Sequence, residues 1–326
     1  MHSMPRNILI LLLALSLVSC SANATPTPEP ESMIVKLSWR HGVQFLGYYI
    51  AQQNGFYAEE NLIVQIEAIN DPSEIFELAN GVASGTYDFS MNSTPLIAEQ
   101  VAGAPVITIA TILQVSPQTF FTRADRGINS PADFAGLRVA VTADSTRNSL
   151  EGLLQNAGLT LDDVEVVPSG FDMTPFYEGD VDVWVGYLTN EVIRARQQGL
   201  EITTFPSYEY GIRTTEEMIF TRSEIVENHP DLAVRFLRAT LRGWQWAVEH
   251  PSEAVEIMLE MFPDMAEDRE FHQTSFSAYI PLIQLPGVPI GSINCDRWLA
   301  NPGFEGIITT DGLCTPDIFD QAVTAE

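Results

Sequence analysis

Short apolar runs alternate along the chain with longer segments in which apolar residues recur at helical spacing, beginning near residue 35. Such runs predict strands, and the segments between them predict amphipathic helices, several of which end at a glycine. In the first part of the chain, the predicted strands are residues 35–38, 62–68, 87–91 and 106–114, and the predicted helices are 45–53, 73–81 and 94–102. This β-α-β-α-β order predicts an α/β sheet that is covered by helices on both faces.

The same rhythm begins again near Phe134 and predicts a second, compact α/β unit. Its predicted strands are 137–141, 164–167, 180–187 and 200–205, and its predicted helices are 145–158 and 191–199. A strand over 218–221 and amphipathic helices over 230–250 and 252–261 follow, and the Pro- and Gly-rich tail over 281–326 predicts loops and short helices. We therefore expect lobe 1 to comprise residues 33–120 and 217–326, lobe 2 to comprise 121–216, and a hinge to lie at the two chain crossings.

The N-terminal segment has the pattern of an export signal. Arg6 precedes an apolar run from Ile8 to Val18, which is too short for a hydrocarbon core that needs about 20 residues. Small residues before Cys20 resemble the lipobox of bacterial lipoproteins, which implies lipidation of Cys20; an ordinary signal peptide is the alternative. The Pro-rich segment 21–32 favours extended geometry. We expect a signal peptide over 1–19, a tether over 20–32, and a body anchored on the extracytoplasmic face of the cell membrane.

Composition and charge exclude several classes of function. Lys and Arg total 16 against 43 Asp and Glu, and the resulting net charge of −27 excludes nucleic acid as a partner. The chain has one lysine, Lys36, and no phosphate-loop, GxSxG or HExxH pattern. Cys295 and Cys314 lack a neighbouring His pair, so we expect neither a metal site nor a cofactor. An exported compartment permits a disulfide between these two cysteines, with two buried thiols as the alternative.

Three segments carry a family resemblance. The first, residues 39–64 (WRHGVQFLGYYIAQQNGFYAEENLIV), resembles the start of bacterial binding proteins for thiamine-pyrimidine precursors, with Asn61 in place of a usual glycine. The second is residues 182–191 and the third is 243–251. The likeness covers residues 33–265. It implies a two-lobed periplasmic-binding-protein fold of type II, and a monomeric solute-binding component that docks on an ABC permease. The form GVQFLGYY after a lipoprotein start is similar to the riboflavin-binding, RibY-like branch, which favours riboflavin. Hydroxymethyl- or formylaminopyrimidine is the alternative ligand.

Polar and aromatic residues gather where predicted strands run into helices, the usual place for ligands in α/β folds. A flat heterocycle suits such a set, because rings stack on its faces while amides and hydroxyls meet its edge. Core packing of Trp39 and Tyr48 and helix capping by Ser145, Thr146 and Asn190 are the structural alternatives. The candidate ligand-binding residues are Trp39, Gln44, Tyr48, Asn92, Ser93, Ser145, Thr146, Tyr187, Asn190, Glu191 and Tyr208.

Two observations favour different ligands. The carboxylate of Glu191 suits an aminopyrimidine, which offers an amino group beside a ring nitrogen, whereas the branch resemblance favours riboflavin. Eukaryotic relatives of the family synthesise the pyrimidine, for which they require a lysine and a histidine. Lys36 and His41 are the available pair, and we expect the Lys36 stem to be buried with its amine in water. The export signal argues against cytosolic synthesis, so we predict a binding protein and no enzyme.

Overall fold

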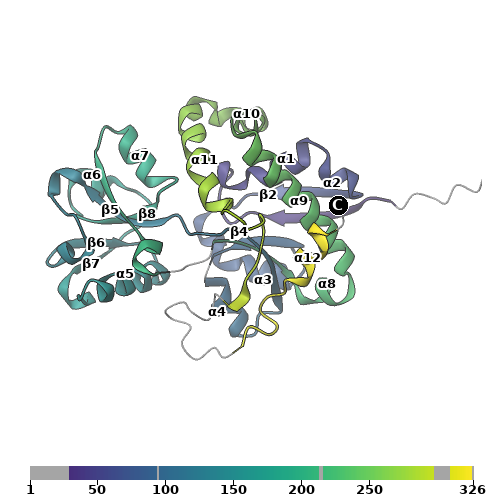
Figure 1. Cartoon of the computed structure of the whole chain (residues 1–326), viewed down its shortest axis with the longest axis horizontal. Helices are drawn as coiled ribbons and strands as arrows, with labels where there is room; N and C mark the ends of the chain where they lie inside the picture. Colours follow the sequence, from purple (N-terminus) through teal and green to yellow (C-terminus); the bar gives the residue numbers. More distant parts are fainter. Residues whose placement is uncertain (1–28, 94, 213–215, 297–308, 325–326) are drawn as a thin grey trace, which may run out of the picture.

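The chain forms two α/β bodies that lie side by side (Figure 1). The computed structural model describes residues 29–93, 95–212, 216–296 and 309–324. The predicted signal peptide, Cys20 and the tether up to residue 28 lie outside these residues. No helix in the described ranges has the length and apolar character needed to cross a bilayer.

The larger body is built on a five-stranded sheet with the order β2-β1-β3-β10-β4. β10 runs antiparallel to both of its neighbours, β3 and β4, while β1 is parallel to β2 and to β3. β10 therefore begins at the edge of the sheet where the other four strands end. The strands are β1 (Glu31–Lys36), β2 (Leu62–Glu67), β3 (Phe89–Asn92), β4 (Val106–Leu113) and β10 (Glu216–Arg222).

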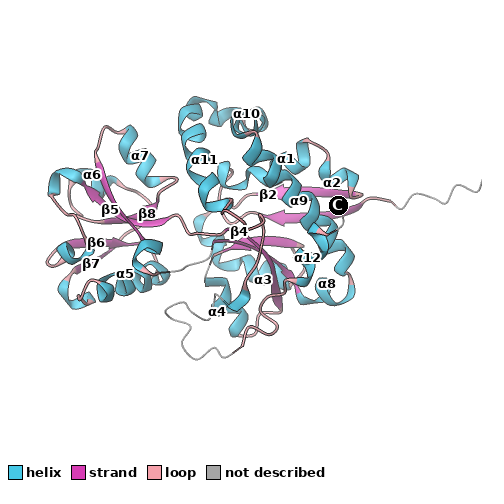
Figure 2. Cartoon of the chain, viewed as in Figure 1, coloured by secondary structure: helices cyan, strands magenta, loops and turns pink. Residues whose placement is uncertain are grey.

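Helices cover this sheet on both sides and share one hydrophobic core with it (Figure 2). The central contact joins α1 and α9, whose backbones approach closely because Gly47 and Gly243 face the opposite helix. Asn61 adopts the left-handed conformation, with φ 59°, as its place in the motif predicts. The helices are α1 (Leu46–Gln53), α2 (Phe56–Glu59), α3 (Leu78–Ala83), α4 (Pro95–Val101), α8 (Ser223–Asn228), α9 (Pro230–Glu249), α10 (Pro251–Met261), α11 (Arg269–Ile283) and α12 (Asp317–Val323).

The smaller body holds a three-stranded sheet, β8-β5-β9, and a parallel pair, β6-β7, joined by a bridge between Val139 and Val183. Asp182 anchors the junction of the two sheets, since it accepts hydrogen bonds from Arg126 and from the backbone and side chain of Arg138. The elements are β5 (Gln118–Arg123), β6 (Arg138–Val141), α5 (Asp144–Asn156), β7 (Glu165–Pro168), α6 (Thr174–Glu178), β8 (Trp184–Tyr187), α7 (Glu191–Gln197) and β9 (Ile202–Pro206).

Three sequence-based expectations need correction. β5 was not predicted, and the expected boundary at 120/121 cuts through it, although the whole strand pairs with β8 and β9. The boundary at 216/217 likewise separates Glu216 from β10, to which it belongs. The chain therefore crosses before Gln118 and again before Glu216. The tail also contains the end of α11, a fifteen-residue helix that passes through Pro281.

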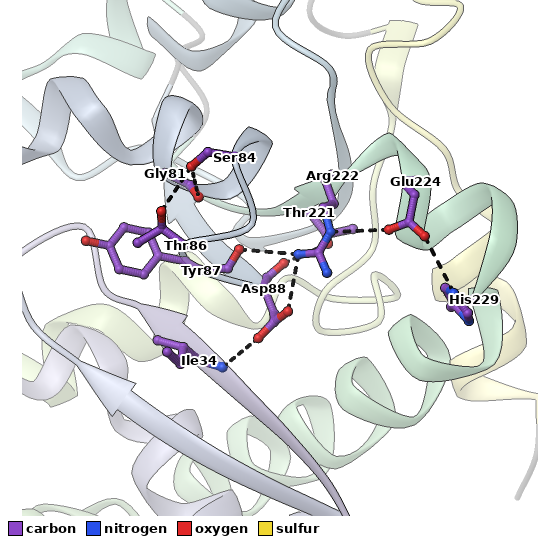
Figure 3. A network of polar contacts seen from close by, with 10 residues as sticks. All are labelled: Ile34, Gly81, Ser84, Thr86, Tyr87, Asp88, Thr221, Arg222, Glu224 and His229. Atoms are coloured by element: carbon purple, nitrogen blue, oxygen red, sulfur yellow. Dashed lines mark hydrogen bonds and ion pairs between the residues drawn. The ribbon is translucent and has the colours of Figure 1, made fainter.

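Two features fasten distant segments of the larger body. The structure joins Cys295 to Cys314 in a disulfide, and Cys314 forms a bridge with Thr108 of β4, which ties the tail to the sheet. At the sheet edge away from the β1 carboxyl end, Asp88 accepts the backbone N–H of Ile34 at 2.8 Å and a hydrogen bond from Arg222 at 3.2 Å (Figure 3). This network connects β1, β3 and β10 and therefore has a structural role.

Candidate functional site

Side chains from both bodies meet where the strands of the larger sheet end. Trp39 follows β1, and its ring lies edge-on to that of Phe171, which follows β7, with 5.0 Å between the ring centroids. Tyr187, at the end of β8, donates from its hydroxyl to Glu216 Oε2 over 3.1 Å. We call the region defined by Trp39, Phe171, Tyr187, Glu216 and Glu217 the lobe junction.

Two adjacent carboxylates lie at the start of β10, inside the lobe junction. Glu216 is buried, and both of its oxygens accept hydrogen bonds, one from Ser116 at 3.1 Å and the other from Tyr187. Glu217 has only a long contact of 3.5 Å with the Ser38 hydroxyl, and its Oε2 is enclosed without a partner. Burial raises the pKa of Glu216 to about 7. Burial, together with the charge of Glu216, raises the pKa of Glu217 to about 8.

Two adjacent tyrosines of α1 have polar atoms inside the larger body. Tyr48 and Tyr49 are both completely buried. The Tyr49 hydroxyl is 2.9 Å from Nδ1 of His41, whereas the Tyr48 hydroxyl has no partner. Burial raises the pKa of the Tyr48 phenol well above its usual value, and the charge of Glu217 raises it further. Tyr48 thus holds an unpartnered polar atom within the electrostatic reach of Glu217.

The predicted cluster at the end of β8 is held together by its own hydrogen bonds. Glu191 Oε2 accepts the backbone N–H of Tyr187 at 2.8 Å, and Oε1 accepts the amide of Asn190 at 2.9 Å. A Cβ on Gly186 would lie 2.8 Å from the Glu191 side chain, so this glycine makes room for the carboxylate. Burial raises the pKa of Glu191 against these hydrogen bonds. The structure brings Tyr187, Asn190 and Glu191 together as predicted.

Other candidates take local roles. The Thr146 hydroxyl accepts the backbone N–H groups of Thr142 and Ala143, which makes it a helix-start residue. Asn92 is buried at the end of β3, and its side-chain oxygen accepts the backbone N–H of Ser93 at 2.8 Å. Tyr208 is 38% exposed in the 3-10 turn Ser207–Tyr210. The ligand contacts of Tyr208, Gln44 and Ser145 stay predictions.

A second contact between the bodies joins α7 to α11. Arg194 pairs with Asp268 at 3.0 Å and lies over the ring of Phe271, with 3.4 Å from the guanidinium carbon to the centroid. The Ser275 hydroxyl donates to the carbonyl oxygen of Thr189 over 2.6 Å. These contacts hold α11, which the sequence pattern did not predict, against the smaller body.

The lysine and histidine that a synthase would use are occupied. Lys36 is 4% exposed, so the expectation of an amine in water is wrong. Its Nζ pairs with Glu74 at 3.1 Å and donates to the carbonyl oxygen of Ala68 over 3.0 Å. His41 stacks on Phe262 with 4.1 Å between ring centroids, and burial lowers its pKa. Within the described residues, no three His, Cys, Asp or Glu side chains are grouped to hold a metal ion.

Sequence reasoning missed three residues of the lobe junction. Phe171 lies in a loop without periodicity, and it is 62% exposed despite its contact with Trp39. Glu216 and Glu217 look like two solvated acids before a strand. Only the antiparallel course of β10 places them at the edge where β1, β3 and β4 end. The signal that was available was the adjacency of two carboxylates to the second chain crossing.

Comparisons with known proteins agree with this arrangement. The model of the family described as NMT1/THI5 like matches residues 43–254. The formylaminopyrimidine-binding protein of Halalkalibacterium halodurans is 28% identical over 302 residues, which cover 90% of this chain and 87% of that protein. The riboflavin-binding protein RibY of Chloroflexus aurantiacus is 26% identical over 236 residues, covering 72% of this chain and 67% of that protein.

An enzyme and a solved structure extend the comparison. The 4-amino-5-hydroxymethyl-2-methylpyrimidine phosphate synthase of Legionella pneumophila is 28% identical over 251 residues, covering 75% of this chain and 78% of that protein. The periplasmic aliphatic sulphonate binding protein SsuA of Escherichia coli superposes with a TM-score of 0.64 at 15% identity, covering 82% of this chain and 83% of that one. The two bodies therefore form the periplasmic-binding-protein fold that the sequence predicted.

Proposed function

Because the chain belongs to the NMT1/THI5-like family, we propose that it is the solute-binding component of an ABC importer and captures a flat heteroaromatic vitamin or vitamin precursor. The observation that carries this proposal is the meeting of aromatic and polar side chains from both lobes at one junction. Trp39 and Phe171 offer ring faces to a planar solute, while Tyr187 and the carboxylates offer polar edges. Closure of the lobes around the solute creates the form that docks on a permease.

Between the two ligands considered, an aminopyrimidine suits the lobe junction better than riboflavin does. Glu191, Glu216 and Glu217 all lie close to the junction, and within the described residues none of them forms an ion pair with Lys, Arg or His. Carboxylates are acceptors, so they favour a ligand edge with N–H donors, whereas the pyrimidine edge of riboflavin offers two carbonyl oxygens beside one N–H. Riboflavin, which the branch resemblance favours, remains the second candidate because RibY is among the relatives.

The proposal is tested by titrating the protein from residue 21 onward, which retains the whole of β1, with 4-amino-5-hydroxymethyl-2-methylpyrimidine, its formylamino analogue and riboflavin in a calorimeter. We expect one of the aminopyrimidines to bind at least tenfold more tightly than riboflavin. Tighter binding of riboflavin would reverse the choice of ligand. Absence of heat with all three compounds would contradict both ligand proposals.

Replacing Phe171 by alanine in the same titration probes the aromatic pair. Phe171 stands next to Trp39 from the opposite lobe, so its loss should remove a stacking face and weaken binding about tenfold. Phe76→Ala is the matched control, because Phe76 is as exposed as Phe171, at 64% against 62%, but belongs to lobe 1 and makes no ring contact described in the structure. Equal affinities of the two variants would exclude a role for Phe171 in binding.

We also propose that lipid on Cys20 holds the protein at the extracytoplasmic face of the cell membrane as a monomer. The support is the signal pattern and the Pro-rich segment that follows it. In a bacterial host, the full chain should fractionate with membranes, and Cys20→Ser should shift it to the soluble fraction. Membrane association that survives this substitution would contradict lipidation at Cys20.

A synthase is not proposed. Such an enzyme would need a lysine that is free to react, and the amine of Lys36 is buried in an ion pair with Glu74 and a hydrogen bond to Ala68. Breaking the ion pair between Lys36 and Glu74 would leave the Glu74 carboxylate without its cation.

A further inference from the structure

Glu217 combines two unfavourable features that a purely structural residue would not need. Its backbone has φ 52°, in the left-handed region, which is strained for a residue with a side chain. Its side chain brings a carboxylate oxygen into an enclosed position with no hydrogen-bond partner. Strain and an unsatisfied buried acceptor at the same residue are typical of a binding position.

The neighbouring Glu216 shows the contrast. It connects the two chain crossings and β8, since it accepts from Ser116 and from Tyr187 and thus has both oxygens satisfied. Glu216 has a structural role that accounts for its burial. Glu217 has no such role, and the salt bridges among the described residues include neither of the two acids.

A second unsatisfied buried atom lies within the electrostatic reach of Glu217. The Tyr48 side chain is completely buried, its hydroxyl has no partner, and it lies close enough to Glu217 for that charge to raise the pKa of the phenol. A carboxylate accepts hydrogen bonds, while a phenol donates one and accepts another. The two groups are therefore complementary to a ligand edge that carries an N–H donor beside an acceptor.

We propose that Glu217, together with Tyr48, is a specificity-determining residue that accepts the N–H donor of an amidine-like edge, such as the 4-amino group and adjacent ring nitrogen of an aminopyrimidine. This inference rests on the proposed function and names the edge of the solute that the protein reads. The 4-amino group donates to Glu217, while the adjacent ring nitrogen of the neutral aminopyrimidine carries no hydrogen and accepts a hydrogen bond, which the Tyr48 hydroxyl can donate. An analogue with a carbonyl oxygen at position 4 would place an acceptor against Glu217 and be rejected.

The test compares 4-amino-5-hydroxymethyl-2-methylpyrimidine with its 4-oxo analogue on the wild type, Glu217→Gln, Tyr48→Phe and Glu209→Gln. We expect Glu217→Gln to lower the affinity for the amino compound at least 30-fold and the affinity for the oxo compound less than threefold. Tyr48→Phe should lower the affinity for the amino compound about fivefold. Glu209→Gln is the matched control, because Glu209 is an exposed acid that precedes the same chain crossing, and its affinities should not change.

The outcomes separate this inference from the proposed function. If the wild type binds the amino compound and Glu217→Gln binds it within threefold, the role of Glu217 is wrong while the binding function stands. If the wild type binds only riboflavin, or none of the compounds, the amidine-like edge is wrong as well. Tyr48→Phe supplies a second result should Glu217→Gln fail to fold, and an unchanged affinity there also counts against the inference.

Discussion

Replacing Gly243 by alanine should lower the free energy of unfolding by about 3 kcal/mol and the melting temperature by about 10 °C. A Cβ at this position would lie 2.0 Å from the carbonyl oxygen of Gly47 and 2.9 Å from Cβ of Ala51. Neither atom belongs to a flexible side chain, so α1 and α9 must move apart. That movement would open the main helix contact of the larger lobe. Thermal and urea denaturation of the purified variant measure the effect.

Gly170→Ala is the control for this prediction. An added Cβ there meets nothing within 4 Å, and the backbone is not left-handed, so stability should change by less than about 0.5 kcal/mol. Gly47→Ala should resemble Gly243→Ala, because its Cβ would lie 2.2 Å from the indole ring of Trp244. If Gly243→Ala proves as stable as Gly170→Ala, the close approach of the two helices is wrong.

The same glycines show how far the sequence could lead. Gly47, Gly186 and Gly243 belong to the three segments that carry the family resemblance, and the resemblance gave no physical reason for any of them. The structure supplies it, since each glycine clears space for one neighbour: Gly47 for Trp244, Gly186 for Glu191 and Gly243 for the Gly47 carbonyl. Spacing along a chain does not reveal which elements cross, so these reasons require the tertiary arrangement.

The strands and helices with clear periodicity were predictable, and those without it were not. β5, QTFFTR, has five buried residues in succession, which removes the alternation that marks a half-buried strand. α11 contains Pro281, which reads as a break, although the helix continues to Ile283. The omission of α11 concealed the contact of Phe271 and Asp268 with Arg194, one of the links between the lobes.

The candidate site was predictable where it lies at the carboxyl ends of strands that run into helices. Trp39, Tyr187, Asn190 and Glu191 follow from that rule. Glu217 does not follow from that rule, because it lies at the beginning of its strand. β10 lies antiparallel between β3 and β4, and this places its first residues next to the last residues of its neighbours. Its left-handed backbone also has no sequence signature at a glutamate.

Between pH 7 and pH 9 the free energy of unfolding should fall by about 1–2 kcal/mol. In the folded protein the pKa of Glu216 is raised to about 7 and that of Glu217 to about 8. An unfolded glutamate is already ionised in this range. The folded state therefore holds more protons, and its stabilisation is complete at low pH and is lost as pH rises through these values. Urea denaturation at pH 7, 8 and 9 measures the slope.

Other groups around the pair do not titrate in this window. Tyr48, Tyr49, Tyr187 and Tyr279 have pKa values raised by burial, so their phenols stay neutral up to pH 9 in the folded state. Burial lowers the pKa of His41 and of His272, and the resulting gain of stability with pH is complete near pH 7. The slope above pH 7 thus reports on Glu216 and Glu217.

Glu217→Gln tests the assignment of this slope. The substitution removes the group with the higher pKa and also the like charge beside Glu216, so stability should vary by less than about 0.5 kcal/mol between pH 7 and pH 9. At pH 9 the variant should be at least as stable as the wild type, because a buried carboxylate without a cation is replaced by a neutral amide. A wild-type stability that stays level or increases over this range would show that the two carboxyl groups are not held protonated, and would remove the main electrostatic argument for an uncompensated acceptor at the junction.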